Sequence, residues 1–399
     1  MQALSKREMV VLLAALYCAQ GLPAGFLAHA LPAILRSQDV DLAIIGALKL
    51  LALPWLLKVL WAPWVDRLSI KALGKHRSWI IPCQLLVIGL LSALALVPMS
   101  HLFGQGLSFL LAVLLLINLA CATQDIASDG LNVRLMQGSL RGLGNSLQVG
   151  GYKVGMLISG SGLLLVVAQW GWQLGVSAVV CLLALMLVPV VCFKESHVLP
   201  SPIAAKPNLN DWLGLFKTQG FCLWLGVVAT YKLGDSLGSP MIKPMLVDAG
   251  LSIGQIGTLT LASTGVGILG AALGGYAYAK LGPLRLLLAA GVAQALGLGM
   301  MALLVNQADE RVLVYSVTLF EQGADGLSSV ALFAAMMNAC RPSHEGTDYT
   351  LQACAQLLMA GFIGGASGVL AKSIGYEALF IGSALLGLAV LPLVWLRLR

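Results

Sequence analysis

Several ionisable side chains lie inside long apolar stretches of this sequence. Glu321 and Asp325 are four residues apart, and Lys232 and Asp235 are three apart in another stretch, so each pair shares one face of a helix. An ionisable group costs at least ~2.5 kcal/mol near the centre of a bilayer and therefore normally faces a cavity or a partner. Buried carboxyl groups beside a lysine can carry a proton or bind a cation, and the pattern predicts this chemistry.

The same reasoning extends to other polar residues of the apolar stretches. We expect Glu321 and Asp325 to carry a transferable proton or to bind a substrate cation, with Lys232 as the countercharge. The alternative is a static network of salt bridges that fastens the helices together, and Asp129 could simply pair with Arg134. The candidate proton-coupling or substrate-binding residues are Glu321, Asp325, Lys232, Asp235, Asp125, Asp129, Lys153, Gln148, Gln352 and Asp348.

The elements that must position these residues are membrane-spanning helices. Apolar residues make up 59% of the 399 positions and charged residues 10%, whereas a soluble domain carries about 25% charged residues. Apolar runs of roughly 20 residues are long enough to cross a hydrocarbon core of ~30 Å as helices. Twelve such runs are predicted, at residues 9–35, 42–65, 79–99, 107–132, 145–168, 173–193, 221–247, 253–279, 284–305, 312–339, 347–371 and 376–396.

The basic residues of the connectors predict the orientation of these helices. Most of them fall on one side, and only Arg36, Arg311 and Lys372 fall on the other. Because Lys and Arg in short loops stay on the cytoplasmic side, we expect a multi-pass protein with both termini in the cytoplasm. The net charge of +7 then reflects membrane topology, and no nucleic-acid partner is expected.

The sequence divides into two related halves. The longest polar interruption contains Pro200, Pro202 and Pro207 and separates six runs from six. Asp125 and Asp129 precede Gly-Leu in the first half, just as Glu321 and Asp325 precede Gly-Leu in the second. We therefore predict an N-terminal six-helix bundle at residues 1–196, a cytoplasmic linker at 197–218 and a C-terminal six-helix bundle at 219–399.

This organisation resembles the major facilitator superfamily, whose two parallel six-helix repeats rock around a central site. Asp66 and Arg67, followed by Lys75 and Arg77, are similar to the cytoplasmic loop signature of that superfamily, with Ala62 in place of its first glycine. The resemblance implies an all-α membrane protein of twelve transmembrane helices with this fold, in which Asp66 and Arg67 are gating residues. Ordinary positive-inside charge is the alternative explanation for the loop.

A narrower resemblance rests on the acid-bearing segments and the helix that follows them. Residues 124–129, 141–157 and 231–235 look like those of AmpG-type muropeptide permeases and their relatives, the RhtX and FptX type siderophore importers. The end of the chain after the twelfth helix and the segment at residues 346–352 favour the siderophore side. The resemblance implies proton-coupled import of a ferric siderophore by alternating access across the bacterial inner membrane. The alternative is an anhydromuropeptide permease.

Other classes of protein fit the sequence less well. It has no G-x-x-x-x-G-K-[ST] loop for an ATP-driven engine, and no H-E-x-x-H or G-x-S-x-G motif. A membrane-embedded transferase that uses the buried carboxyl groups, a scramblase and a channel remain alternatives. The eight cysteines lie in or beside apolar runs without CxxC spacing, so we expect no metal site. We expect a non-enzymatic monomer without a cofactor, whose partners are a small-molecule substrate, protons and membrane lipids.

Overall fold

A computed structural model describes residues 5–38, 48–70, 72–103, 106–195, 213–307 and 310–398, and the regular elements of this part are helices. Six helical segments are long and apolar enough to cross a membrane. They are Lys6–Ser37, Arg77–Leu96, Leu107–Leu135, Leu140–Cys192, Gly254–Leu304 and Glu345–Leu398. Most of the predicted linker, residues 197–212, and the start of the second predicted run lie outside the described residues.

Three of these segments are each two helices joined at a glycine. Gly171, Gly282 and Gly375 have φ values of 84°, 75° and 83°, in the left-handed region that residues with a Cβ rarely adopt. Each glycine reverses the chain between two membrane-length helices, as the predicted boundaries near these positions require. The predicted tenth span is α17 (Arg311–Asn338), which is less apolar than the six segments because it carries Glu321 and Asp325.

The chain divides into two compact units. Unit 1 comprises residues 1–135, 151–212 and 341–350, and unit 2 comprises residues 136–150, 213–340 and 351–399. The helix α9 (Leu140–Leu157) therefore passes from unit 2 to unit 1, and α18 (Glu345–Leu398) passes from unit 1 to unit 2. Residues 136–150 thus belong to unit 2, although the rest of the first half of the sequence belongs to unit 1. Residues 341–350 belong to unit 1, although the rest of the second half belongs to unit 2.

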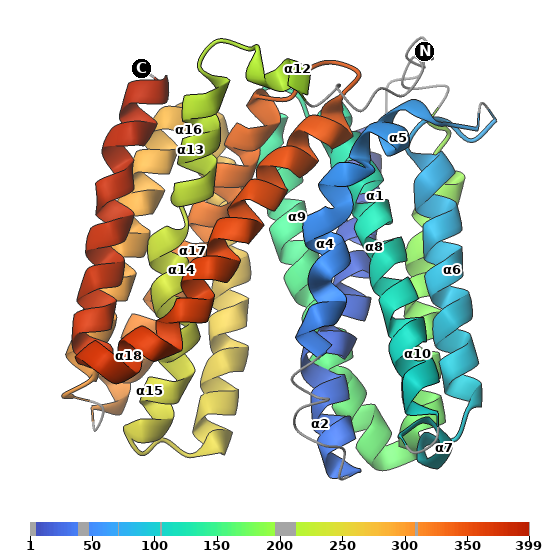
Figure 1. The fold of residues 1–399 in the computed structure, drawn as a ribbon, viewed down its shortest axis with the longest axis horizontal. Coiled ribbons are helices and arrows are strands. Elements are labelled where there is room, and N and C mark those ends of the chain that lie inside the picture. The colour runs from blue at the N-terminus through green and yellow to red at the C-terminus, as the bar shows by residue number, and fades with distance from the viewer. Residues whose placement is uncertain are drawn as a thin grey trace. The chain divides into compact units, whose positions relative to one another are not determined.

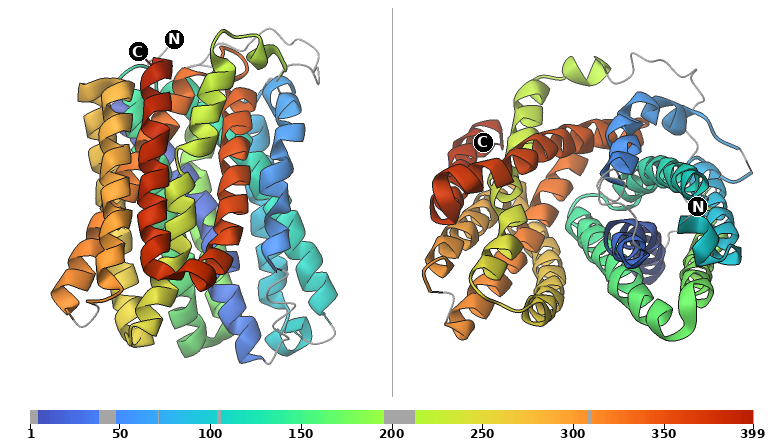
Figure 2. Two further views of the ribbon diagram at one scale, coloured as in Figure 1. Left: turned by 60° about the vertical axis from the view of Figure 1, so that its left-hand side comes forward. Right: turned by 60° about the horizontal axis from the view of Figure 1, so that its bottom comes forward.

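Unit 1 contains α1 (Lys6–Gly25), α6 (Arg77–Leu96), α8 (Leu107–Leu135) and α10 (Leu163–Cys192), with α6 beside α8 and α10 (Figure 1). α1 packs against α8 and α10 (Figure 2), and Leu22, Leu91 and Ile117 lie in the shared core. A Cβ on Gly21 would lie 2.2 Å from the carbonyl oxygen of Tyr152, so the backbones of α1 and α9 are in contact. Unit 1 also contains the shorter elements η1 (Phe26–Ala30), α2 (Leu31–Ser37), α7 (Met99–Phe103) and η4 (Ile158–Gly162).

Unit 2 is built on α17 and α16 (Ile253–Leu304), which pack closely along their length. A Cβ on Gly270 or on Gly326 would lie 2.1 Å from a backbone oxygen of the facing helix, so these glycines let the two backbones meet. Met301, Val317 and Phe380 belong to the same buried core. This packing places the acid-bearing face of α17 inside the bundle.

Two predicted helices are broken rather than continuous. The second predicted run contains η2 (Leu48–Ala52), α4 (Leu53–Leu57), η3 (Lys58–Leu60) and α5 (Ala62–Arg67). The seventh contains α13 (Phe221–Thr230), α14 (Leu233–Gly238), η6 (Ser239–Met241) and α15 (Ile242–Asp248), after the short α12 (Leu213–Phe216). Prolines inside both runs remove backbone donors and explain part of the interruption. A lysine lies at a break in each run: Lys58 begins η3, and Lys232 precedes α14 with non-helical dihedral angles.

Candidate functional site

In unit 1, the break in the second run meets the acids of α8. The Lys58 ammonium forms a salt bridge with Asp125, and both side chains are buried, with exposed fractions of 5% and 10%. On the next turn of α8, the Tyr17 hydroxyl donates to Asp129 Oδ1 at 3.0 Å, and Asn132 Nδ2 donates to the Tyr17 oxygen at 2.8 Å. Both predicted acids of α8 therefore belong to one buried polar cluster.

In unit 2, the break in the seventh run meets the acids of α17. Lys232 Nζ donates to Asp325 Oδ1 at 2.7 Å and to Ser328 Oγ at 2.8 Å. The carboxylate of Asp235 lies 3.8 Å from the same ammonium group. The structure thus brings together the predicted countercharge and two of the predicted acids.

Glu321 lies deeper in the same cluster and is fully buried. Its Oε2 accepts a hydrogen bond from Gln322 Nε2 at 2.8 Å, and its Oε1 accepts one from Gln294 Nε2 at 3.3 Å. Ser239 Oγ lies 3.3 Å from Glu321 Oε1 and 2.6 Å from Asp235 Oδ1. Because the Ser239 hydroxyl has one proton and lies closer to Asp235, its oxygen can accept a hydrogen bond from a protonated Glu321.

The charges of the unit 2 cluster do not balance. Among the residues that the structure describes, the cluster brings together the carboxyl groups of Asp235, Glu321 and Asp325 with one ammonium group, that of Lys232. Since separated charge is costly away from water, such a group of carboxyls lowers its energy by taking up a proton or a cation. A small cavity beside the cluster is lined by Lys232, Asp235, Gln294, Ser328, Gly291 and Gly387. Tyr231, Ala295 and Leu298 complete the lining, and the polar groups of Lys232, Asp235, Gln294 and Ser328 could hold a water molecule that delivers a proton.

A second polar network lies at the end of α5, outside the membrane-spanning helices. The buried Asp66 carboxylate accepts hydrogen bonds from the backbone N–H and the hydroxyl of Thr347, and Lys75 lies 2.9 Å from it. Burial by itself raises the pKa of an aspartate, but the Lys75 ammonium and the Thr347 hydrogen bonds hold the pKa of Asp66 below its ordinary value. A carboxylate in this position stabilises the first turn of α18, where the helix amides are unpaired.

Further contacts surround this helix end, and all of them lie within unit 1. Lys75 Nζ also lies 3.2 Å from Glu345 Oε2, and Arg67 Nη2 lies 2.9 Å from His344 Nε2. Both predicted gating residues therefore contact the segment that leads into α18. α18 continues into unit 2, so this network is built on one of the two helices, α9 and α18, that pass from one unit to the other.

A buried histidine and glutamate, which sequence analysis did not select, form a neighbouring cap. Glu195 accepts hydrogen bonds from the backbone N–H of His76 and of Arg77, and from His76 Nδ1 at 2.6 Å. Burial holds the pKa of His76 below its ordinary value, although Glu195 opposes this effect. Burial by itself raises the pKa of Glu195, but the hydrogen bonds from His76 and Arg77 lower it overall. A neutral ring donates through Nδ1 to the Glu195 carboxylate, while its buried Nε2 has no hydrogen-bond partner among the described residues.

The other predicted site residues lie elsewhere. Asp348 is fully buried and accepts from the backbone and the guanidinium of Arg341, with Nε and Nη2 at 2.8 and 2.6 Å. Gln352 accepts from Trp224 Nε1 at 2.6 Å and donates to the Met336 carbonyl, so it joins three helices of unit 2. The structure gives Asp348 and Gln352 packing contacts, and their predicted role in substrate binding or coupling stays a prediction.

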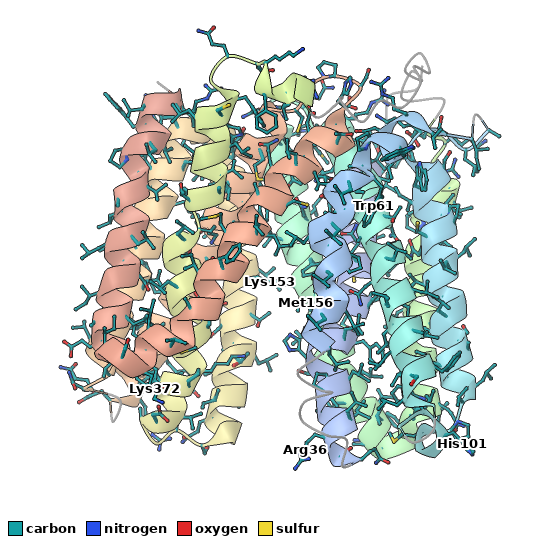
Figure 3. The ribbon with its side chains drawn as sticks, in the orientation of Figure 1. Arg36, Trp61, His101, Lys153, Met156 and Lys372 are labelled. Atoms are coloured by element: carbon teal, nitrogen blue, oxygen red, sulfur yellow. The ribbon has the colours of Figure 1, made fainter. Side chains whose placement is uncertain are left out.

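Gln148 and Lys153 lie on α9 and are half-buried, Gln148 in unit 2 and Lys153 in unit 1. Figure 3 shows Lys153 and Met156 about midway along unit 1, while Arg36 and His101 lie at the end of that unit remote from α5. Lys153 therefore lies at the depth expected for a residue inside the membrane. Sequence reasoning missed Tyr17, Gln294, Ser239 and Ser328 as members of the clusters.

Comparisons with known proteins identify transporters. The family model described as acetyl-coenzyme A transporter 1 matches residues 9–169. The chain is 26% identical over 380 residues to the anhydromuropeptide permease of Escherichia coli (strain K12), covering 92% of this chain and 74% of that protein. It is 25% identical over 386 residues to putative transporter AmpG 4 of Rickettsia conorii, covering 93% and 92%.

Solved structures of transporters share the fold. The human organic anion transporter MFSD10 (TETRAN) superimposes with a TM-score of 0.72 at 15% identity, covering 97% of this chain and 99% of that one. A bacterial homologue of the iron transporter ferroportin gives a TM-score of 0.71 at 15% identity, covering 98% and 99%. The chain is thus an all-α protein with the major facilitator superfamily fold, and its relatives include AmpG-like permeases.

The expected siderophore substrate is wrong. The relatives at 25–26% identity are named anhydromuropeptide permease or AmpG transporter, whereas the iron-related neighbour, at 15% identity, shares only the fold. The segment at 346–352 misled the prediction, because its side chains make contacts inside the protein: Thr347 binds Asp66, and Asp348 binds Arg341. These contacts carry no information about the substrate.

Proposed function

We propose that the protein is a secondary active transporter of the bacterial inner membrane. It imports an anhydromuropeptide, or a related sugar-linked peptide, and the inward proton gradient drives this import. The observation that carries the proposal is the pair of buried clusters, in each of which a lysine at a helix break forms a salt bridge with an acid of the fourth or tenth span. Broken helices that expose polar backbone line the binding sites of many transporters. A peptide offers ammonium, carboxylate and amide groups, all of which such clusters can bind.

Glu321 and Asp325 are the proposed proton carriers, with Lys232 as their countercharge. The three carboxyl groups of the unit 2 cluster outnumber its one ammonium group, that of Lys232, so binding a proton lowers the free energy of the cluster. A proton gradient directed inward then drives import. Asp125 and Asp129 of unit 1 are proposed to hold the substrate's polar groups. The transporter works as a monomer in this proposal, with both termini in the cytoplasm.

Asp66 and Arg67 are the proposed cytoplasmic gate. Asp66 holds the first turn of α18 through Thr347, and Arg67 holds His344 just before it. Alternating access requires the cytoplasmic ends of the two halves to part, and release of this helix end is one step of that opening. Lys75 stabilises the closed gate because it lies between the carboxylates of Asp66 and Glu345.

Uptake into proteoliposomes under an imposed pH gradient tests the proposal. Purified protein is supplied with a labelled anhydromuropeptide, with acetyl-coenzyme A because of the family match, and with the free peptide lacking the sugar. We expect saturable anhydromuropeptide uptake that requires a proton gradient directed inward, with the solute recovered unaltered. Uptake of acetyl-coenzyme A alone, uptake that ignores the gradient, or a chemically changed product would each contradict the proposal.

A further inference from the structure

The side-chain amide of Gln294 lies at the centre of the unit 2 cluster. Gln294 is in the second half of α16, and 6% of it is exposed. Its Nε2 donates to Asp235 Oδ1 at 3.1 Å and to Glu321 Oε1 at 3.3 Å. Its Oε1 accepts from Ser328 Oγ at 2.8 Å and from Lys232 Nζ at 3.4 Å. All hydrogen-bonding positions of the amide are therefore used inside the cluster.

The neighbours of this amide fix its orientation. Carboxylates accept hydrogen bonds and an ammonium group donates them, so the nitrogen faces Asp235 and Glu321 and the oxygen faces Lys232. One rigid planar group thus joins the buried acid of α17 to the lysine at the break in the seventh run. Any change in the charge of Glu321 alters the hydrogen bond that Gln294 donates to it.

We propose that Gln294 is a positioning residue that transmits the protonation state of Glu321 to the helix break at Lys232. The inference rests on the proposed role of Glu321 as a proton carrier. With Glu321 ionised, both N–H groups of Gln294 are held by carboxylates. When Glu321 Oε1 takes up a proton, the new O–H donates to Ser239 Oγ, and the Gln294 N–H loses its charged acceptor. The amide then shifts toward Asp235, loosening its hold on Lys232 and freeing the break.

The glutamine of the corresponding third span in unit 1 makes different contacts. Gln84 donates to the Leu183 carbonyl at 3.0 Å and accepts from Gln124 at 3.4 Å. Neither of these two contacts involves Lys58 or Asp125. The link through Gln294 thus belongs to the cluster with the larger surplus of carboxyl groups, three carboxyls with Lys232 compared with two carboxyls with Lys58.

Hydrogen–deuterium exchange of the purified full-length protein tests this link without any transport substrate. Glu321→Gln mimics the protonated acid, and the readout is exchange of the backbone amides at residues 231–239, which span the break. In the native background we expect Glu321→Gln to raise this exchange about tenfold, the effect of one hydrogen bond to a charged group. In a Gln294→Met background the same change should raise it by less than about twofold, because the link is already absent.

Gln322→Met is the matched control, because Gln322 also donates to Glu321 but, in the part of the chain that the structure describes, forms no side-chain hydrogen bond with residues 231–239. In that background Glu321→Gln should keep its full effect on residues 231–239. An equal effect of Glu321→Gln in the native and Gln294→Met backgrounds overturns the inference, as does the absence of any effect in the native protein. If Gln294→Met does not elute as a monodisperse peak, Gln294→Asn, which keeps an amide but withdraws it, replaces it with the same expectations. Failure of muropeptide uptake leaves this result unaffected, so the two proposals fail separately.

Discussion

The two buried clusters use the same kinds of residue in different pairings. In unit 1, Lys58 binds Asp125, the first acid of its pair, and Tyr17 binds Asp129, the second. In unit 2, Lys232 binds Asp325, which corresponds in the repeat to Asp129, and the tyrosine of the seventh span, Tyr231, donates to the Leu287 carbonyl instead. The repeat thus conserves residue types along the chain but not the contacts they make.

We infer from these different pairings that the two clusters have different roles in transport. In unit 1, Lys58 forms an ion pair with Asp125 and Tyr17 donates a hydrogen bond to Asp129. In unit 2, Asp235 adds a third carboxyl group, and Gln294 donates to two of the acids. We therefore propose that the unit 1 cluster holds polar groups of the substrate and that the unit 2 cluster takes up the coupling proton.

Replacing the two lysines should give the largest difference between the clusters, measured as the loss of stability. Lys58→Met leaves Asp125 buried without its partner, and breaking a buried ion pair costs about 3–5 kcal/mol of stability. Lys232→Met should cost less, about 1–3 kcal/mol, because 20% of the Asp325 side chain is exposed. Chemical unfolding in detergent micelles measures both. Adding Asp125→Leu to Lys58→Met should restore most of the loss, and a larger loss for Lys232→Met than for Lys58→Met would reverse the comparison.

Neutralising one acid of each cluster should affect uphill accumulation and exchange of the solute differently. Asp325→Asn should lower uphill accumulation of the solute at least about tenfold while exchange between loaded vesicles continues, because only proton coupling is removed. Asp125→Asn should lower accumulation and exchange together, because it alters a site that holds the substrate. Parallel uptake and exchange assays measure the ratio, with the exposed Glu377→Gln as the control. Equal loss of both activities in Asp325→Asn would remove its coupling role.

The tyrosines give a smaller contrast. Tyr17→Phe removes the buried hydroxyl that donates to Asp129 and accepts from Asn132, and should cost about 1–3 kcal/mol, together with reduced substrate affinity. Tyr231→Phe removes one bond to a backbone carbonyl and should cost about 1 kcal/mol without a change in KM. Unfolding and the concentration dependence of uptake measure the two effects. A change in KM for Tyr231→Phe alone would place the substrate in unit 2.

The sequence predicted the helices and the acids because both depend on local pattern. Long apolar runs and the cost of burying charge identify Glu321, Asp325 and Lys232 without knowledge of tertiary contacts. Reversal of the chain at Gly171 and Gly282 also fell near the predicted boundaries. The breaks at Lys58 and Lys232 were missed because apolar content does not distinguish a continuous helix from an interrupted one.

The pairings within the clusters could not be predicted because they depend on the packing of distant segments. Gln294 is a single amide in an apolar run, and its role becomes visible only where α16 packs against α17. Glu195 and His76 are 119 residues apart and meet through tertiary packing alone. The substrate was mispredicted for a related reason: the segment that suggested it makes contacts that hold a helix end.

The cap formed by His76 and Glu195 gives the smallest expected effect and serves as a control for pH effects that do not arise in the two clusters. The pKa of His76 is lowered by burial and by Lys75 and Arg134, with Glu195 opposing, so the folded protein keeps the ring neutral where the unfolded chain binds a proton. The unfolded state then binds more protons below about pH 6.5, and the free energy of unfolding falls as the pH drops through that range. Asp66 and Glu195, whose pKa values are lowered, lose their contribution only below the ordinary range of carboxyl groups, so His76 dominates in mild acid.

His76→Asn keeps a donor close to the position of Nδ1, facing Glu195, and removes the titration. We expect this variant to abolish the loss of stability in mild acid while leaving the pH profile of uptake unchanged, because the proposed coupling protons bind in unit 2. Unfolding at several pH values and uptake at the same values measure the two quantities. A shifted uptake profile in His76→Asn would mean that acid acts through the cap formed by His76 and Glu195, and the contrast between the two clusters would then no longer account for the pH dependence of transport.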